Sequence, residues 1–240
     1  MMSIKVNETF SGKKVLITGI TGFKGSWLSL WMQNIGAKVY GLAVDIPTNP
    51  ANFEVLGLEE KIENFFEADI NEYEKIKNII SEIQPDFVFH LAAQPLVRQS
   101  YLNPIETFKT NSIGLLNVLN ACYEVLQKVN LILCTSDKAY KNKEWIWGYK
   151  ESDELGGYDP YSASKAMAEI GIRSFNQSFL KNKPGIKIAT GRAGNVIGGG
   201  DWAADRLVPD IIKSWSTGDE VNIRMPMATR PWQHVLEPLS

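Results

Sequence analysis

The sequence predicts an α/β fold in which helices cover both faces of one doubly wound parallel sheet. Short apolar runs alternate along the chain with segments of helical apolar spacing, which is the pattern of repeated βαβ units. A glycine-rich turn follows the first apolar run, and a Tyr-x-x-x-Lys sequence opens a later helix. In such sheets ligands bind at the carboxyl ends of the strands, where the strand order reverses.

Seven apolar runs have the length of strands. Most are rich in Val, Ile, Leu or Phe and stop at a glycine or a polar residue, as strands buried on both faces do. The expected strands are residues 14–18, 38–44, 61–67, 86–92, 130–134, 187–190 and 220–224. The polar clusters discussed below each follow one of these runs.

Helical segments lie between the expected strands. The expected helices are residues 27–35, 72–83, 104–126, 161–179 and 205–215. The isoleucines of residues 72–83 fall on one helical face, which predicts an amphipathic helix. Asn103 and Asp159 each precede a proline, which is typical of a capping residue followed by proline at the first helical position.

Composition excludes several classes of protein. The 240 residues, 44% hydrophobic and 22% charged, suffice for one α/β domain, or for one domain plus part of another. A net charge of -2 argues against a general nucleic-acid binder. No apolar run approaches the roughly 18 residues of a membrane span, and residues 1–9 lack a signal-peptide core, so we expect a cytoplasmic protein. Cys122 and Cys134 predict two reduced core thiols and no metal site.

The glycine-rich turn predicts a dinucleotide site of the Rossmann type. Gly19 permits a tight turn, Gly22 lets backbone amides approach a pyrophosphate, and Gly25 lets the following helix pack close to the strand. The positive end of that helix then favours the diphosphate. Phe23 lies inside the turn, and the spacing is G-x-x-G-x-x-G.

Other residues at strand ends complete the expected dinucleotide site. Asp45, about 20 residues after the turn, would bind the adenosine ribose diol and repel a 2′-phosphate, which favours NAD over NADP. Asp69 and Ile70 are expected near the adenine. Leu91, Ala92 and Ala93 would place small side chains beside the dinucleotide.

Tyr161 and Lys165 are expected to act together. Positions four apart on a helix share one face, so the hydroxyl and the ammonium can point into one pocket. A nearby ammonium lowers a tyrosine pKa from its usual value of about 10. The pair therefore predicts a proton acceptor for hydride transfer at a sugar or alcohol carbon.

The Tyr-x-x-x-Lys pair, with a hydroxyl at the end of the fifth strand, resembles the short-chain dehydrogenases/reductases, and the glycine spacing resembles their extended branch. Five further runs resemble the CDP-glucose 4,6-dehydratases over essentially the whole chain. They are TGITGFKGSW at residues 18–27, HLAAQPLV at 90–97, TSDK at 135–138, GNVIGGGDW at 194–202 and RPWQHVLEPL at 230–239.

The resemblance implies a hydro-lyase that uses NAD catalytically to convert a nucleotide-linked glucose into a 4-keto-6-deoxy sugar. Tyr161 would take the proton from O4 during oxidation at C4, Ser136 would hydrogen-bond the same oxygen, and Lys165 would hold the nicotinamide ribose. Asp137 and Lys138 would then serve the loss of water across C5 and C6. Related dTDP-glucose enzymes carry Asp-Glu at this point. Lys138 as the C5 base would have to be neutral, so our hypothesis makes Lys138 the base and Asp137 the acid.

The resemblance also assigns the substrate site and a domain division. Arg206 and Arg230 would bind the substrate diphosphate, since guanidinium pairs bidentately with phosphate oxygens, and Asn195 would lie near the sugar phosphate. Residues 1–190 are expected to form the NAD-binding domain and residues 191–240 part of a substrate-binding region. The resembled family continues past Ser240, so this region is expected to be incomplete.

Several alternatives remain open from the residues themselves. A nucleotide-sugar 4-epimerase or reductase would share the Tyr-Lys pair and the glycine turn, and a non-catalytic NAD-binding fragment would share them too. Spacing does not fix the nucleotide base. The superfamily implies a homodimer or higher homo-oligomer formed through two long helices, where Leu115, Leu119, Met167 and Ile170 could serve the interface or the core. Surface-polysaccharide synthesis is the expected pathway.

Overall fold

A six-stranded parallel sheet forms the centre of the computed structural model, which describes residues 2–223 and 225–240. The strand order is β3-β2-β1-β4-β5-β6, and every neighbouring pair is parallel. The strands are β1 (Lys14–Thr18), β2 (Lys38–Ala43), β3 (Asn64–Glu67), β4 (Phe87–His90), β5 (Val129–Cys134) and β6 (Ile186–Gly191). The predicted doubly wound sheet is therefore confirmed, with its order reversing between β1 and β4.

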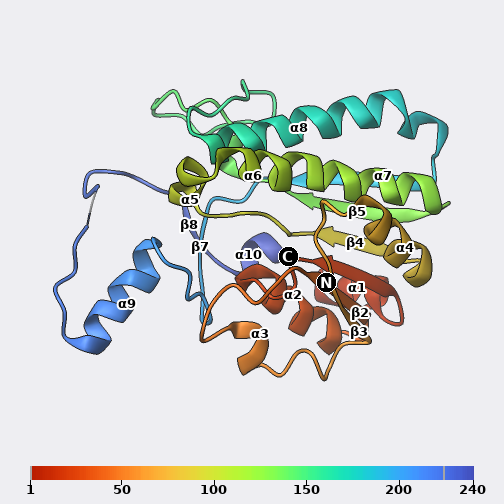
Figure 1. Ribbon diagram of the computed structural model, residues 1–240, viewed down its shortest axis with the longest axis horizontal. Helices are drawn as coiled ribbons and strands as arrows, with labels where there is room; N and C mark the ends of the chain where they lie inside the picture. The colour runs from red at the N-terminus through yellow and green to blue at the C-terminus, as the bar shows by residue number, and fades with distance from the viewer. Residues whose placement is uncertain (1, 224) are drawn as a thin grey trace.

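Helices cover both faces of this sheet, as Figure 1 shows. One core layer contains Leu16 and packs against α4 (Tyr73–Ile83), α7 (Leu115–Val125) and α8 (Pro160–Ser178). The other contains Val15 and Ile17 and packs against α2 (Phe23–Asn34) and α3 (Asn52–Val55). Successive side chains of a strand point to opposite faces. The middle of β1, residues 15–17, can therefore be apolar at every position because both faces of the strand are covered.

Shorter elements join and extend these layers. They are α1 (Met2–Phe10), α5 (Val97–Leu102), α6 (Pro104–Phe108), the π-helix η1 (Lys109–Gly114), the 3-10 helices η2 (Asp137–Ala139) and η3 (Leu180–Asn182), β7 (Asn195–Ile197), α9 (Leu207–Thr217), β8 (Trp232–His234) and α10 (Leu236–Leu239). Within the described part of the chain, no helix is both long and apolar enough to cross a membrane.

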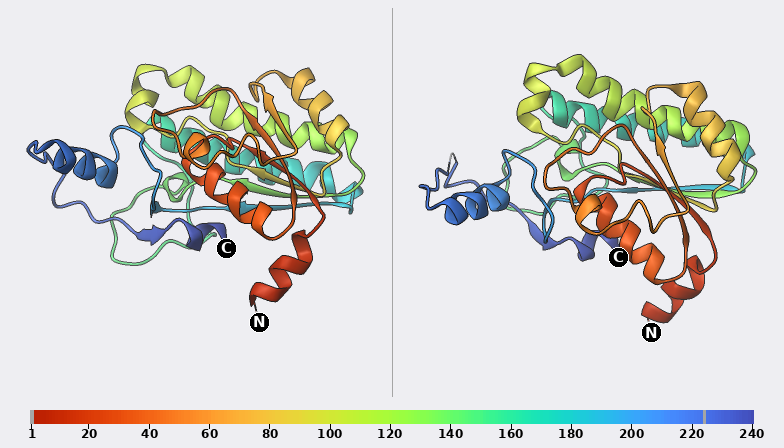
Figure 2. Two further views of the ribbon diagram at one scale, coloured as in Figure 1. Left: turned by 90° about the horizontal axis from the view of Figure 1, so that it is seen from below. Right: turned by 60° about the horizontal axis from the view of Figure 1, so that its bottom comes forward.

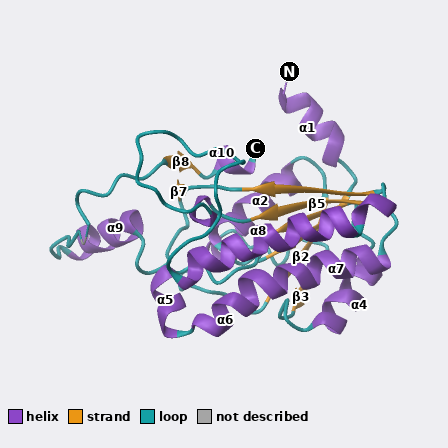
Figure 3. Ribbon diagram, turned by 90° about the horizontal axis from the view of Figure 1, so that it is seen from above, coloured by secondary structure: helices purple, strands orange, loops and turns teal. Residues whose placement is uncertain are grey.

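Two of the predicted elements differ from the observed ones. The strand expected at 220–224 is wrong over residues 220–223, which form no strand, and residue 224 lies outside the described residues. This segment follows α9, which projects away from the central sheet (Figures 2 and 3), so no strand is available to pair with it. The helix expected over 104–126 is divided by the π-helical turn η1 between α6 and α7.

The two helix starts predicted from proline also differ from each other. Asp159 caps α8, since its carboxylate accepts a hydrogen bond from the Ser162 amide at 2.9 Å. Asn103 precedes α6, but its side chain makes no capping hydrogen bond. At the start of α8, the Tyr161 backbone amide also donates a hydrogen bond to the Ser100 hydroxyl at 3.2 Å. Helix α5, which contains Ser100, therefore helps to fix the first turn of α8, the helix that carries the Tyr-Lys pair.

The chain after β6 is anchored on α2. Strands β7 and β8 pair in parallel, and the indole of Trp27 donates a hydrogen bond to the Gly199 carbonyl at 2.8 Å. Val235, directly after β8, is fully buried and lies against the position of Gly198. Helix α2 therefore supports both the glycine turn and the C-terminal residues. The division into domains at residue 190 stays a prediction.

The close packing of α2 on β1 makes Gly25 sensitive to substitution. A Cβ atom at Gly25 would lie against the carbonyl oxygen of Gly19, which is backbone and cannot rotate away. We expect Gly25→Ala to lower the free energy of unfolding by about 1–3 kcal/mol, the usual range for overpacking. Urea unfolding followed by circular dichroism measures this change. Gly148→Ala is the control, because nothing lies within 4 Å of a Cβ there. Equal stability of both variants would contradict the packing argument.

Candidate active site

One cavity of about 1040 Å³ lies at the carboxyl ends of the strands. Every residue assigned to a site from the sequence lines it: Gly19, Gly22, Phe23, Gly25, Asp45, Asp69, Ile70, Leu91, Ala92, Ala93, Ser136, Asp137, Lys138, Tyr161, Lys165, Asn195, Arg206 and Arg230. These residues come from segments along almost the whole chain, and the parallel sheet brings them to one edge. Their roles as ligands stay predictions.

The glycine turn forms a cradle that side chains would fill. Gly19 has φ +71°, and a Cβ there would lie 2.7 Å from the Ala92 amide nitrogen. Thr21 donates a hydrogen bond to the Asp45 carbonyl at 2.7 Å, which joins the turn to the end of β2. The turn leads directly into the N-terminus of α2, with Gly22 as its capping residue. This arrangement leaves room and backbone amides for a pyrophosphate group.

Tyr161 and Lys165 are both buried, with 9% and 3% of their surface exposed. The Lys165 Nζ lies 5.9 Å from the centroid of the Tyr161 ring. Burial raises the pKa of Tyr161 to about 12, and a hydrogen bond with Ser136 opposes this only in part. The expected lowering of the tyrosine pKa by Lys165 is therefore wrong for the ligand-free protein, because desolvation outweighs the available positive charge.

Lys165 is itself destabilised as a cation. Its pKa falls to about 8, mainly because of burial; Cys134 opposes this change and the charge of Lys24 adds to it. Among residues 2–223 and 225–240, its ammonium forms no hydrogen bond and no ion pair. The buried His90 nearby stays neutral, since burial and the charge of Lys165 lower its pKa to about 3. The His90 ring pairs with the Thr18 hydroxyl at 2.9 Å.

Ser136, Asp137 and Lys138 form the tip of β5. The Lys138 amide donates to the Ser136 hydroxyl oxygen at 3.2 Å, and the Ser136 hydroxyl donates to Asp137 at 3.1 Å. These contacts fold the tip into the short 3-10 helix η2. The Asp137 charge raises the pKa of Tyr161, which places the carboxylate within electrostatic reach of the phenol.

Two arginines of the cavity are paired with carboxylates. Arg206 pairs with Asp201 at 2.8 Å, and Arg98 pairs with Asp205 at 2.8 Å. Arg230 is exposed and donates to the neighbouring Thr229 carbonyl at 2.9 Å. Asn195 lies in β7, where its amide donates to the Pro231 carbonyl at 3.1 Å. Arg98 was not expected from the sequence, because its partner lies 107 residues away.

Asn111 is a further residue that sequence reasoning missed. Its side chain donates to the Gln94 carbonyl at 3.1 Å and to the Ser164 hydroxyl at 2.9 Å, and it accepts from the Gln94 amide at 2.8 Å. It is 1% exposed. Asn111 thus ties the segment after β4 to the helix of Tyr161 and Lys165.

The fold and the cavity define a Rossmann-type protein of the short-chain dehydrogenase/reductase superfamily. The model of the GDP-mannose 4,6 dehydratase family matches residues 16–238. The chain therefore belongs to this family.

Curated relatives include the CDP-glucose 4,6-dehydratase of Salmonella typhimurium, which is 51% identical over 96% of this chain and 65% of its own length. The dTDP-D-glucose 4,6-dehydratase of Dictyostelium discoideum is 28% identical over 83% of this chain and 47% of its own. The chain thus spans less than two thirds of the length of these relatives.

Solved structures share the fold. The dTDP-glucose 4,6-dehydratase DesIV of Streptomyces venezuelae, with NAD and TYD bound, superposes with a TM-score of 0.81 at 20% identity, covering 94% of this chain and 69% of that one. The UDP-glucose 4-epimerase of Thermotoga maritima, with UDP-glucose, has a TM-score of 0.81 at 25% identity, covering 94% of this chain and 71% of that one.

The unpaired burial of Lys165 predicts a stability change with a defined pH dependence. Since its pKa falls from 10.5 to about 8 on folding, the unfolded chain binds more protons between these values, and stability rises with pH across that window. We expect Lys165→Met to stabilise the ligand-free protein at pH 7 by about 1–3 kcal/mol.

Denaturant unfolding of both proteins at pH 7 and at higher pH measures this effect. The gain should shrink as pH rises above 8 and should be smallest near 10.5, the ordinary lysine pKa. A variant that is less stable than the parent at pH 7 would show that the Lys165 ammonium has a favourable partner.

Proposed function

We propose that this protein is a hydro-lyase that uses NAD catalytically to dehydrate a nucleotide-linked glucose, with CDP-glucose as its substrate and the 4-keto-6-deoxy sugar as its product. The observation that carries the proposal is the single cavity in which Tyr161, Lys165 and the Ser136–Lys138 tip meet the glycine turn. The 51% identity to a CDP-glucose 4,6-dehydratase supports the substrate, including the cytosine base.

The residues of the glycine turn fit NAD. The space that a Cβ of Gly19 would occupy is bounded by Ala92, so only glycine leaves room for a dinucleotide beside it. The N-terminus of α2 would hold the diphosphate. Asp45 would bind the adenosine ribose diol and disfavour NADP, and Asp69 and Ile70 would lie at the adenine. When bound, NAD would supply a hydride acceptor for C4 of the sugar and a hydride donor for C6.

Tyr161 would take the proton from the O4 hydroxyl, with Ser136 hydrogen-bonded to the same oxygen. The phenol has a pKa of about 12 in the ligand-free protein, so Lys165 alone does not prepare it for this role. The positive charge of an oxidised nicotinamide would favour the phenolate. Lys165 would bind the nicotinamide ribose, which gives its buried ammonium the hydrogen-bond partners that it otherwise lacks.

Asp137 and Lys138 would carry out the elimination. Oxidation at C4 acidifies the C5 proton, which a base then removes while an acid protonates the leaving C6 hydroxyl. We assign the base to Lys138 and the acid to Asp137. Asp137 accepts a hydrogen bond from Ser136 at 3.1 Å, which keeps its carboxylate beside the serine hydroxyl. Lys138 is half-buried at the cavity wall.

Arg206 and Arg230 would bind the diphosphate of the substrate, and Asn195 would bind the sugar phosphate. In the ligand-free protein Arg206 is held by Asp201, so the substrate would exchange one anionic partner for another. Bidentate pairing of guanidinium with phosphate favours that exchange.

The setting of this activity completes the proposal. We place the enzyme in the cytoplasm as a homodimer or higher homo-oligomer that supplies deoxysugars for surface polysaccharide. Leu115 and Leu119 are fully buried in the core, so they do not serve an interface. Met167 and Ile170 are 42% and 58% exposed on α8 and stay candidates for one.

Incubation of the purified protein with NAD and CDP-glucose tests the proposed activity. The product should show the alkaline absorbance of a 4-keto sugar and the mass of a dehydrated substrate. We expect Tyr161→Phe to lower kcat by about 10²–10⁴-fold, the usual contribution of a positioned general base. Tyr158→Phe is the control, because Tyr158 is 85% exposed and does not line the cavity. Epimerised sugar without loss of water would indicate the 4-epimerase, and NAD binding without conversion would indicate a non-catalytic protein.

A separate experiment tests the assignment at C5. Lys138→Met should abolish exchange of the C5 proton with deuterium from solvent while C4 oxidation continues, so the absorbance of reduced cofactor should accumulate. Mass spectrometry of recovered substrate and product measures the exchange. Lys150→Met, which changes an exposed lysine in the next loop, should exchange normally. Unchanged exchange in Lys138→Met would assign the base elsewhere.

A further inference from the structure

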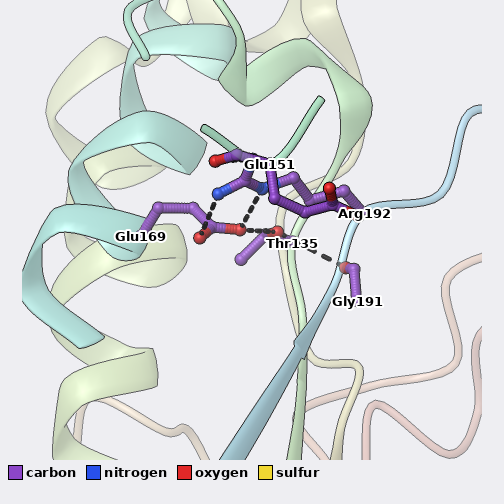
Figure 4. A network of polar contacts seen from close by, with 5 residues as sticks. All are labelled: Thr135, Glu151, Glu169, Gly191 and Arg192. Atoms are coloured by element: carbon purple, nitrogen blue, oxygen red, sulfur yellow. Dashed lines mark hydrogen bonds and ion pairs between the residues drawn. The ribbon is translucent and has the colours of Figure 1, made fainter. Parts of the chain in front are cut away.

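A largely buried ion pair between Arg192 and Glu169 joins the end of β6 to α8 (Figure 4). Arg192 donates from Nε and Nη2 to the two carboxylate oxygens of Glu169, at 2.9 and 2.8 Å. The side chains are 11% and 5% exposed. Thr135 donates its hydroxyl proton to the same carboxylate at 2.5 Å. Neither Glu169 nor Arg192 lines the cavity, so the proposed chemistry does not use them directly.

The pair joins the elements that carry the catalytic candidates. Glu169 lies on α8, one helical turn after Lys165 and two turns after Tyr161. Thr135 immediately precedes Ser136, and Arg192 follows the end of β6. The guanidinium thus connects the helix of the Tyr-Lys pair with the chain beside the Asp137–Lys138 tip.

Backbone hydrogen bonds transmit this connection to Asp137. The Thr135 amide donates to the Gly191 carbonyl at 2.8 Å, and the Asp137 amide donates to the Ala193 carbonyl at 3.2 Å. Arg192 lies between these two acceptors in sequence. A shift of Arg192 would therefore move both contacts that hold the β5 tip.

The same guanidinium also contacts the loop that follows the tip. Its Cζ atom lies 4.7 Å from the centroid of the Tyr140 ring, within the range of cation–π attraction. Tyr140 in turn stacks on Tyr149, with centroids 5.1 Å apart. Contacts of Arg192 and its neighbour thus flank the Asp137–Lys138 tip: Ala193 binds the Asp137 amide, and Arg192 itself lies over the Tyr140 ring that follows the tip.

The geometry makes the pair difficult to replace. Burial raises the pKa of Glu169, but the hydrogen bonds from Arg192 and Thr135 outweigh burial and lower it, so the carboxylate stays ionised. A bidentate pair fixes both side chains in one orientation. Loss of one partner leaves the other charge buried and uncompensated, so the local chain must move to hydrate it.

We propose that Arg192 and Glu169 are positioning residues for the elimination step, which hold Asp137 and Lys138 at a fixed place relative to Tyr161. The effect on catalysis rests on the proposed dehydration. The structural claim, that the ion pair holds the β5 tip in place, does not depend on that activity. Oxidation at C4 depends mainly on Tyr161, Ser136 and Lys165, so it should depend less on the pair than elimination does.

Hydrogen exchange of the Arg192→Met protein tests the structural part without any substrate. We expect the Asp137 amide to exchange at least about tenfold faster than in the parent. The Gly19 amide donates to the Leu42 carbonyl at 2.7 Å, between the ends of β1 and β2. These strands do not neighbour β5 or β6, so this amide should keep its protection. Lys187→Met is the control, because Lys187 is an exposed cation on β6, the strand that leads to Arg192. Unchanged exchange at Asp137 overturns the proposal, whether or not the parent protein dehydrates CDP-glucose.

Rapid kinetics with NAD and CDP-glucose test the catalytic part. Displacement of reacting groups by about 1 Å can cost about 10²-fold in rate, so we expect a loss of that size in elimination, with KM nearly unchanged and reduced cofactor accumulating. An equal loss in oxidation and elimination would indicate a general structural role and would overturn the proposal. A parent that forms no product refutes the proposed function, and the exchange experiment then decides the positioning of the tip.

A second pair of variants covers the case in which Arg192→Met does not fold. Thr135→Val removes the hydroxyl that joins Glu169 to β5, with nearly the same shape, and Thr135→Ser keeps it. We expect faster exchange at Asp137 in Thr135→Val and recovery of protection in Thr135→Ser. The same exchange rate in both variants would overturn the proposal.

Discussion

The site depends on one constraint, the close approach of the backbone segments that follow the paired strands β1 and β4. Gly19 lies against Ala92, and Gly25 lies against the carbonyl of Gly19, so neither position has room for a side chain. These two glycines let α2 pack close to the sheet beside the cavity. Because α2 also carries Trp27, which binds Gly199, the same constraint locates the residues that follow β6.

Burial of ionisable groups gives the cavity its electrostatic character. Lys165, Tyr161 and His90 are all removed from water, and for each of them desolvation is the largest cause of the pKa shift. Each shift favours the neutral form. Burial therefore disfavours the charged form of Lys165. By contrast, Glu169 is buried beside a bound guanidinium and remains charged, so it can hold structure where Lys165 cannot.

Much of the fold could be predicted from the sequence because it depends on local patterns. The apolar runs, the glycine turn and the Asp159-Pro160 helix start each involve neighbouring residues, and the cavity collects the site residues that they suggested. Strands β7 and β8 could not be predicted, since three-residue strands become stable only through pairing across 37 positions, as between Asn195 and Trp232. The strand expected at 220–224 had a plausible composition but no neighbouring strand.

Long-range partners account for the other differences. Arg98 pairs with Asp205, and Arg192 pairs with Glu169. Nothing in the sequence next to either arginine indicates these ion pairs. The same holds for the pKa of Tyr161: spacing shows that Lys165 can share a helical face, but the desolvation that dominates depends on how deeply the whole sheet buries the pair. Sequence spacing thus predicts which groups meet, and packing decides their protonation.

The π-helical turn η1 has a consequence for the long helix that contains it. Consecutive residues of an α-helix point about 100° apart, yet Asn111 and Ser112 both bind Ser164. A wider turn makes this possible because it accommodates one extra residue. A homologue with a single-residue deletion between positions 109 and 114 would therefore regain regular winding. Its preceding segment, including α6, would then be rotated by roughly a quarter of a circle against the Tyr-Lys helix.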